Sequence, residues 1–189
     1  MRALAAAALA ALVAACTAQP PASTAAESVP DAFGFGRPAT AAEIRALDVD
    51  VAPDGRGLPP GSGTVAEGER LYAAQCAVCH GATGVEGPWD RLVGDSVPDF
   101  RFGDDPSISG RRAIGNYWPY ATTVFDYVRR SMPHNQPGTL SDNEVYGVTA
   151  WILWRNGIVE RDAVLDSASL VAVRMPARDR FVPDSATRR

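Results

Sequence analysis

The stretch Cys76-Ala77-Val78-Cys79-His80 decides how this chain is built. Two cysteines three positions apart, followed at once by a histidine, form the C-x-x-C-H pattern of covalent haem attachment. At a helix end, thiols with this spacing can reach the two vinyl groups on adjacent pyrroles and form thioethers. The covalent links then hold the imidazole of His80 against the iron. The pattern predicts one covalent haem c with His80 as an axial ligand.

Two other kinds of site also use a C-x-x-C pair. A thioredoxin-like redox pair needs a βαβ context, and the sequence shows none. Half of a zinc site needs a second Cys/His pair, but the only other histidine is His134 and no fourth ligand accompanies it. The remaining cysteine, Cys16, has its own explanation near the N-terminus. Haem attachment is therefore the favoured interpretation.

Three helices are predicted around the motif. A capping box at Thr64–Glu67 begins a helix that runs to Cys76. A second capping box, at Ser141–Glu144, begins an aromatic-rich helix that ends at Asn156-Gly157. Between them, an apolar-periodic stretch closed by Arg129 and Arg130 predicts a third helix. The fold class expected from this pattern is all-α.

A glycine inside the first helix predicts close packing against the last one. Gly68 costs about 1 kcal/mol relative to alanine, so it indicates close approach by another helix. We expect Trp151 to pack there. This pairing resembles class I cytochromes c over roughly residues 63–160. The resemblance implies N- and C-terminal helices that cross around the haem, with extended arms outside them.

The resemblance also implies a methionine as the second axial ligand, in a loop before the last helix. Met132, followed by Pro133, occupies that place, and its thioether would stabilise ferrous iron. His134 is a rival that would give a bis-His site. Met175 also precedes a proline but lies beyond the last helix. An open sixth position, with Met132 packed in the core, is the remaining alternative.

Further contacts to the haem follow from the same resemblance. The carbonyl of Pro88 is expected to accept from the other ring nitrogen of His80 and to fix its orientation. Trp118, Tyr117 or Arg111 could bind a haem propionate. The alternative is that these side chains cover the haem edge or belong to the core.

The N-terminus is predicted to be an export signal. Residues 1–15 carry one early charge and then an apolar run too short to span a bilayer. Val13-Ala14-Ala15-Cys16 resembles a bacterial lipobox, which implies lipidation of Cys16 and a membrane anchor. A plain signal peptide is the alternative. Both place the protein in the periplasm, and Thr17 after Cys16 slightly favours the outer membrane.

The 189 residues are expected to divide into four parts, of which residues 1–15 are the signal peptide. A tether and extended arm covers residues 16–62, with a short helix after the capping box at Thr40–Glu43. The cytochrome c domain covers residues 63–160, and residues 161–189 form a C-terminal tail. The domain has 8 Arg and 12 acidic residues, so a basic docking face is expected on its electron partner and no nucleic acid is expected.

Several stretches outside the motif resemble the cytochrome c subunit of molybdenum-containing sulfite or sulfane dehydrogenases. They are Phe33–Pro38, Gly57–Val65, Tyr117–Tyr120 with Met132-Pro133 and Asn156-Gly157, and Arg174–Pro176 with Arg178-Asp179 and Phe181. The resemblance implies an electron-transfer subunit, not a catalyst, which takes electrons from a molybdenum partner and passes them to a further cytochrome or oxidase. A free-standing membrane-anchored carrier and, if the sixth ligand is labile, a haem sensor or enzyme are the alternatives.

Overall fold

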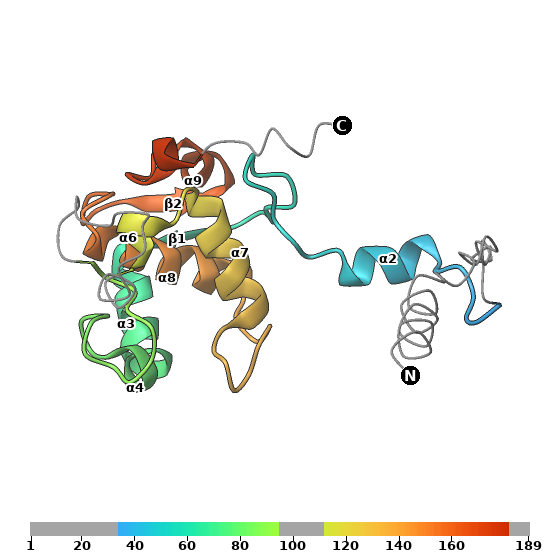
Figure 1. Cartoon of the computed structure of the whole chain (residues 1–189), viewed down its shortest axis with the longest axis horizontal. Helices are drawn as coiled ribbons and strands as arrows, with labels where there is room; N and C mark the ends of the chain where they lie inside the picture. The colour runs from blue at the N-terminus through green and yellow to red at the C-terminus, as the bar shows by residue number, and fades with distance from the viewer. Residues whose placement is uncertain (1–33, 95–111, 182–189) are drawn as a thin grey trace, which may run out of the picture. The chain divides into compact units, whose positions relative to one another are not determined.

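The computed structural model describes residues 34–94 and 112–181 (Figure 1). The chain separates into two units, residues 1–39 and residues 40–189. In the described residues, every helix and strand lies in the second unit, which is mainly helical with one two-stranded sheet. No helix within these ranges is long and apolar enough to cross a membrane. A mainly helical fold is what the sequence predicts.

Helices α3 (Val65–Gln75) and α8 (Asp142–Arg155) form the central pair, and both begin at the capping boxes that the sequence predicts. They approach closely at two glycines. A Cβ on Gly68 would stand 1.8 Å from the carbonyl oxygen of Gly147 and 2.9 Å from Cβ of Trp151. The expected neighbour Trp151 is therefore present, but the Gly147 backbone comes closer. Only glycine at position 68 permits this packing.

Two more helices complete the core against α8. Helix α7 (Ala121–Ser131) turns Val124 and Phe125 inward, while the short helix α6 (Ile114–Tyr117) precedes it. The rings of Phe125 and Tyr146 lie 4.5 Å apart by their centroids, and both are fully buried. Burial of side chains of this size stabilises a fold by roughly 1.5–3 kcal/mol each.

The segment before the helical core packs onto it. Val51 is buried, and its N–H donates to Asp126 Oδ1 on α7 at 2.7 Å. Tyr146 on α8 donates its hydroxyl to the carbonyl of Pro59 at 2.9 Å. Helix α2 (Ala41–Leu47) begins at Thr40 with the predicted capping box, yet none of its residues is buried. Residues 49–60 are thus bound to the core by hydrogen bonds and burial.

The segment after α8 also joins the core. Strand β2 (Val164–Asp166) pairs antiparallel with β1 (Ser62–Thr64), and helix α9 (Ser167–Ala172) follows directly. Leu170 is fully buried. A short 3-10 helix, Arg178–Arg180, comes next. The described part of the tail therefore packs on the helices.

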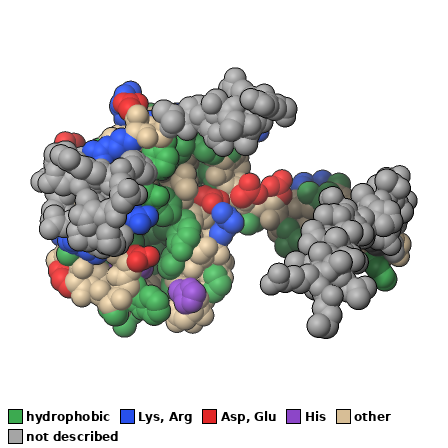
Figure 2. Space-filling model, viewed as in Figure 1, with side chains coloured by type: hydrophobic (Ala, Val, Ile, Leu, Met, Phe, Trp, Pro, Cys, Tyr) green, Lys and Arg blue, Asp and Glu red, His purple; other side chains and the backbone are tan. Residues whose placement is uncertain are grey.

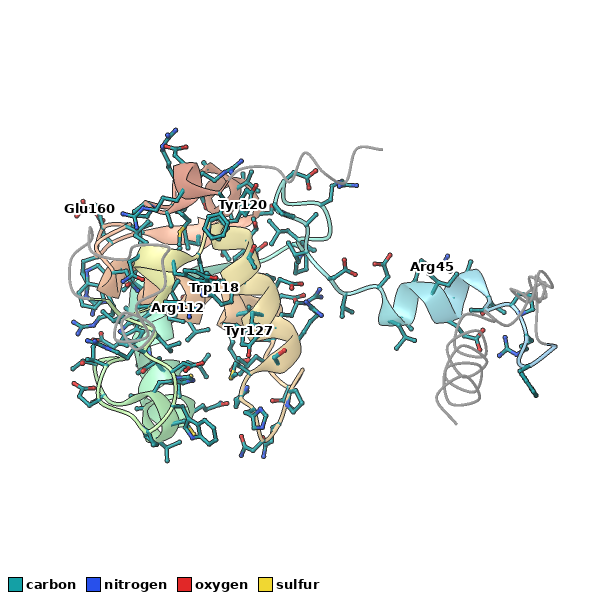
Figure 3. All side chains as sticks on the ribbon, in the orientation of Figure 1. Arg45, Arg112, Trp118, Tyr120, Tyr127 and Glu160 are labelled. Atoms are coloured by element: carbon teal, nitrogen blue, oxygen red, sulfur yellow. The ribbon has the colours of Figure 1, made fainter. Side chains whose placement is uncertain are left out.

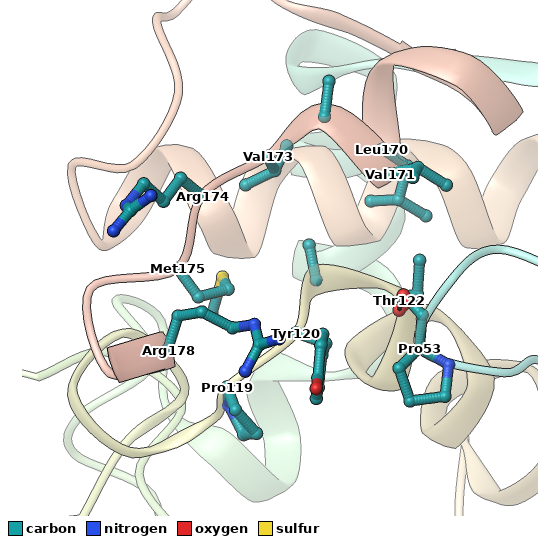
Figure 4. Close-up of a pocket in the computed structure, with 12 residues that line it drawn as sticks. Pro53, Pro119, Tyr120, Thr122, Leu170, Val171, Val173, Arg174, Met175 and Arg178 are labelled. Carbon is teal, nitrogen blue, oxygen red and sulfur yellow. Dashed lines mark hydrogen bonds between the residues drawn. The ribbon is translucent and has the colours of Figure 1, made fainter. Parts of the chain in front are cut away.

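A hollow of about 260 Å³ lies where this tail meets the start of α7 (Figure 4). Met175 lines it and is 1% exposed. The Arg178 guanidinium stacks over the Tyr120 ring, 4.3 Å from its centroid. Met175, a rival for the sixth ligand in the sequence, is a buried core residue here.

Candidate haem site

The turn that carries the two cysteines is a direct continuation of α3. The Cys76 N–H ends α3 by donating to the carbonyl of Tyr72 at 2.9 Å, and the four-residue helix α4 (Ala77–His80) follows. The His80 N–H donates to the carbonyl of Cys76 at 3.0 Å. Cys76 and Cys79 are both free of a disulfide and partly exposed. The turn thus offers both thiols and one imidazole from a single helical corner.

The state of the Cys76 thiol opposes the redox-pair alternative. Burial, with a smaller contribution from Cys79, raises the pKa of Cys76 to about 11. Reactive cysteines of disulfide oxidoreductases have lowered pKa values, because the thiolate is the nucleophile. Nor do residues 34–94 and 112–181 place three or more His, Cys, Asp or Glu side chains to hold a metal ion. The raised pKa of Cys76 thus favours haem attachment over a redox pair.

The imidazole of His80 is oriented by a backbone carbonyl. Its Nδ1 lies 2.8 Å from the carbonyl oxygen of Asp90. Because a carbonyl can only accept, Nδ1 carries the proton, and in the neutral ring Nε2 then has the lone pair. This is the tautomer that a metal ligand needs, and a hydrogen bond to the other ring nitrogen also raises ligand basicity.

The sequence prediction that the Pro88 carbonyl makes this contact is wrong by two residues. The Trp89 N–H donates to the carbonyl of Cys79 at 3.2 Å, so the chain after Pro88 is first bound to the attachment turn. The Leu92 N–H then donates to the carbonyl of Gly84 at 2.9 Å. The turn between these two bonds presents the carbonyl of Asp90 to His80. The length of the loop after His80 decides which carbonyl accepts from Nδ1, and the Gly87-Pro88 pair in the sequence does not show that length.

The loop after His80 is closed by close backbone contacts. A Cβ on Gly87 would stand 2.0 Å from the carbonyl oxygen of Cys79. Tyr72 donates its hydroxyl to the carbonyl of Gly81 at 2.8 Å, and its ring stacks on Trp151 with centroids 3.7 Å apart. Burial raises the pKa of Tyr72 well above its ordinary value. The central helix pair therefore holds the loop directly.

A carboxylate fixes the tip of the same loop. Glu86 accepts from the hydroxyl of Thr83 and, at 3.1 Å, from its N–H. These hydrogen bonds, the side-chain bond first, lower the pKa of Glu86 to about 2. The carboxylate is therefore ionised at all ordinary pH values and keeps the turn closed.

Asn156 is a site residue that the sequence treats only as a helix end. Its Oδ1 accepts from the N–H groups of Gly94 at 3.1 Å and Gly115 at 3.2 Å. Its Nδ2 donates to the carbonyls of Leu92 at 3.0 Å and Ile152 at 2.8 Å. One side chain thus joins the end of α8 to the His80 loop and to α6. A polar residue before the glycine that ends α8 is its sole signal in the sequence.

The other predicted site residues lie at the edge of the core. Met132 directly follows α7, is half-buried, and donates its N–H to the carbonyl of Val128 at 3.0 Å. Trp118 is half-buried and meets Tyr127 edge-on, with ring centroids 5.7 Å apart (Figure 3). His134 is exposed. Arg111 lies outside the described residues, as do the predicted export signal and Cys16.

These residues fit a covalent haem. Apolar side chains at the edge of the core remain incompletely buried, and apolar groups are visible on the surface of this unit (Figure 2). Those packed against the core include Leu71, Cys76, Ala77, Leu92, Trp118 and Met132. A large, flat, mostly apolar group would cover such a surface and remove it from water. Two free thiols and an imidazole with an available Nε2 supply the donor set.

Comparison with known proteins gives a family match and a similar solved structure. The family described as "Cytochrome C oxidase, cbb3-type, subunit III" matches residues 63–152, which include the attachment motif and nearly all of α8. A chain in the crystal structure of the sulfane dehydrogenase SoxCD from Paracoccus pantotrophus is 43% identical, with a TM-score of 0.68. The match covers 83% of this chain and 75% of that one.

Two curated relatives are thiosulfate dehydrogenases. The protein from Psychrobacter arcticus is 30% identical over 112 residues, and the protein from Stutzerimonas stutzeri is 32% identical over 96 residues. The matched segments are 53% and 50% of this chain, but 30% and 28% of the relatives. The chain therefore matches less than a third of the length of either relative.

The match to the SoxCD chain is high in identity and extends over most of both chains. Together with the family match across the C-x-x-C-H motif, it decides the family. The chain belongs to the c-type cytochromes and carries covalently bound haem c.

Proposed function

We propose that this chain transfers single electrons through one haem c, bonded to Cys76 and Cys79 and ligated by His80 and Met132. The contact between His80 Nδ1 and the Asp90 carbonyl is the observation that carries the proposal. It fixes the ring tautomer and leaves Nε2 as the ligand. The bound haem supplies a ferric/ferrous couple. The protein orients the imidazole and excludes water with the apolar side chains around the site.

Met132 is the best candidate for the sixth ligand. Its side chain is half-buried and packs against the core, as Cys76 does. His134 is exposed, and Met175 is buried beside α9. A neutral thioether favours ferrous iron and raises the reduction potential. With both axial positions filled, no position is left for a substrate, which favours electron transfer over catalysis.

The proposed donor is a molybdenum-containing sulfite or sulfane dehydrogenase subunit, and the proposed acceptor is a further cytochrome or oxidase. The 43% identity with a chain of sulfane dehydrogenase SoxCD supports a donor of this class. The relatives named thiosulfate dehydrogenase also act on sulfur compounds by name. The two flanking segments are proposed to contact the donor, although residues 49–60 and the described tail also pack on the haem domain.

The proposed location is the periplasm, with a lipid anchor on Cys16. The apolar run of residues 1–15 and the lipobox-like residues before Cys16 support it. Metabolic labelling with a radioactive fatty acid would test the anchor. Label should appear in the wild-type protein and be absent from Cys16→Ala. Label-free wild-type protein in the soluble periplasmic fraction would instead favour the plain signal peptide.

Optical spectra of the haem-loaded protein test the ligand set. The oxidised wild type should show the weak far-red band of sulfur-to-iron ligation. Met132→Ala should lose that band, and its ferrous form should bind carbon monoxide. Met175→Leu is the matched control, because it removes a methionine from the buried core. It should keep the band.

The contrary results have definite meanings. A far-red band that survives Met132→Ala would exclude Met132 as the ligand. If the wild-type ferrous protein binds carbon monoxide readily, its sixth position is labile, and a haem sensor or enzyme becomes the better proposal. A band present in wild type and lost only in Met132→Ala supports the electron-transfer function.

A further inference from the structure

Two large apolar side chains are exposed at the attachment turn. Val78 lies between the two cysteines and is 80% exposed, and Trp89 in the following loop is 65% exposed. The Trp89 N–H donates to the carbonyl of Cys79, so the backbone that carries the indole is bound to the backbone of the second attachment cysteine. Tryptophan is highly buried on average and is enriched at interfaces. A partner molecule is therefore the natural place to seek its contacts.

The backbone around Trp89 is held on both sides. Before it, Gly87 leaves no room for a side chain against the Cys79 carbonyl. After it, the carbonyl of Asp90 accepts from His80. The main chain thus fixes the position from which the indole projects. A rigid aromatic side chain with few rotatable bonds loses little conformational entropy when it is buried by a partner.

The charges of this segment suggest the chemistry of the partner. Between Cys76 and Arg91 the chain has two acidic residues, Glu86 and Asp90, and one basic residue, Arg91. Arg155 also reaches this loop, because its guanidinium donates to the carbonyl of Thr83 at 3.5 Å. Both acidic side chains are exposed, and residues 63–160 as a whole have an excess of acids. Opposite charges steer association and fix its orientation. Apolar side chains exposed on a domain with an excess of acids fit a partner that has an apolar patch surrounded by Lys and Arg.

We infer that Val78 and Trp89 form the docking surface for a basic protein electron partner, with Trp89 as the anchor. The inference rests on the proposed electron-transfer function and names the surface that serves it. The partner must bring its redox centre near the haem, and the haem is bonded on both sides of Val78. Tryptophan is enriched among the residues that carry most of the binding energy of interfaces.

Zinc-substituted equine cytochrome c, a basic haem protein, is a suitable probe. Its photoexcited porphyrin gives one electron to the ferric haem of this chain, and the triplet decay measures the second-order rate at low ionic strength. Trp89→Ala should lower this rate about 10-fold, as expected for loss of an interface anchor. Trp89→Phe should retain most of it. Leu47→Ala is the control, because Leu47 on helix α2 is also an exposed apolar residue, at 82%.

A second reagent separates this inference from the proposed function. Ferricyanide is small and needs no apolar docking surface, so its reaction with the reduced protein should be equal in wild type and Trp89→Ala. The potential and the far-red band should also be unchanged. A Trp89→Ala rate within twofold of wild type, or an equal loss in Leu47→Ala, would overturn the docking surface. Loss of the ferricyanide reaction in wild type would instead count against electron transfer itself.

Discussion

The two sides of the haem site are held by different amounts of structure. On the His80 side, the imidazole is fixed by the Asp90 carbonyl, and the loop behind it is bound by the Asn156 side chain. On the Met132 side, the candidate ligand directly follows α7 and leads into an exposed turn that begins at His134. The candidate ligand His80 is therefore oriented through its own side chain, whereas the candidate ligand Met132 is held through its backbone N–H, which donates to the carbonyl of Val128.

The strongest test of this difference is Gly68→Ala. The new Cβ would stand 1.8 Å from the carbonyl oxygen of Gly147, and a backbone atom cannot move away as a flexible side chain would. We expect the helices to separate and the free energy of unfolding to fall by about 3 kcal/mol or more. Urea unfolding of the haem-loaded protein, followed by far-ultraviolet circular dichroism, measures the loss.

Gly138→Ala is the matched control on the Met132 side. Gly138 has a φ of 73°, and nothing lies within 4 Å of an added Cβ. Only the cost of the left-handed backbone remains, which is about 1 kcal/mol. If Gly138→Ala destabilises the protein as much as Gly68→Ala does, the close contact between α3 and α8 makes no particular contribution to stability.

Asn156→Ala should have the next largest effect. It removes the acceptor for two backbone N–H groups and the donor for two carbonyls, several of them partly buried. Unpaired buried groups cost about 1–3 kcal/mol each, and water can reach some of these, so a total loss of about 2–3 kcal/mol is expected. Thermal unfolding monitored in the Soret band measures it.

Asn156→Asp sharpens this test. The carboxylate keeps an acceptor for the Gly94 and Gly115 N–H groups but loses the donor to Leu92 and Ile152. Its stability should lie at or below that of Asn156→Ala, because an anion would face two carbonyl oxygens. An aspartate variant as stable as wild type would show that the donor half of Asn156 is unimportant.

The sequence predicts the attachment turn well, because the chemistry there is local. Three capping boxes and the C-x-x-C-H motif are each contained within a few consecutive residues, and the structure has the three helices where the boxes place them. Two features were not predictable in this way: the Asp90 carbonyl as the acceptor for His80, and the four hydrogen bonds of the Asn156 side chain. Both depend on how a loop of particular length returns to the end of α8, and residue type does not encode that distance.

The flanking segments show the same limit. The sequence indicates arms but gives no pairing partner for them. The structure pairs β1 with β2 and seats Val51 on α7, through contacts 75 or more residues apart in the chain. Long-range contacts of this kind produce only weak sequence patterns, such as a valine beside turn residues. Local sequence patterns therefore predict the His80 side of the site. They do not predict the long-range contacts that support α7, the helix before Met132.

Asp126→Asn tests that support on the helix that precedes Met132. Asp126 is buried, accepts from the Val51 N–H, and pairs with Arg130. Asparagine keeps one acceptor but loses the charge, so we expect a loss of about 1–2 kcal/mol. Hydrogen exchange at the Val51 amide should become faster than in wild type. Unchanged exchange at Val51 would mean that the arm is held without this carboxylate.

The smallest expected effect is the pH dependence that Glu86 gives to the His80 loop. Its pKa is lowered to about 2 by the hydrogen bonds from Thr83, against an ordinary value of 4.5. Its contribution to stability is therefore complete above about pH 4.5 and is lost as the pH falls toward 2. Glu86→Gln should be less stable than wild type at pH 6, and the difference should shrink steadily as the pH falls from 4.5 through 2. Urea unfolding at several pH values measures it.

Subtracting the variant from wild type removes the other carboxylates that titrate in the same range. Glu67, Glu144 and Asp166 also have pKa values lowered by the hydrogen bonds of their helix caps, so the raw acid profile belongs to all of them. If the difference in the free energy of unfolding between wild type and Glu86→Gln stays constant with pH, the effect comes from lost packing and not from the charge. The stability difference should instead shrink in acid. If amide hydrogen exchange also becomes faster in residues 81–87 at a higher pH than in residues 134–139, the His80 side of the site depends on this charge and the Met132 side does not.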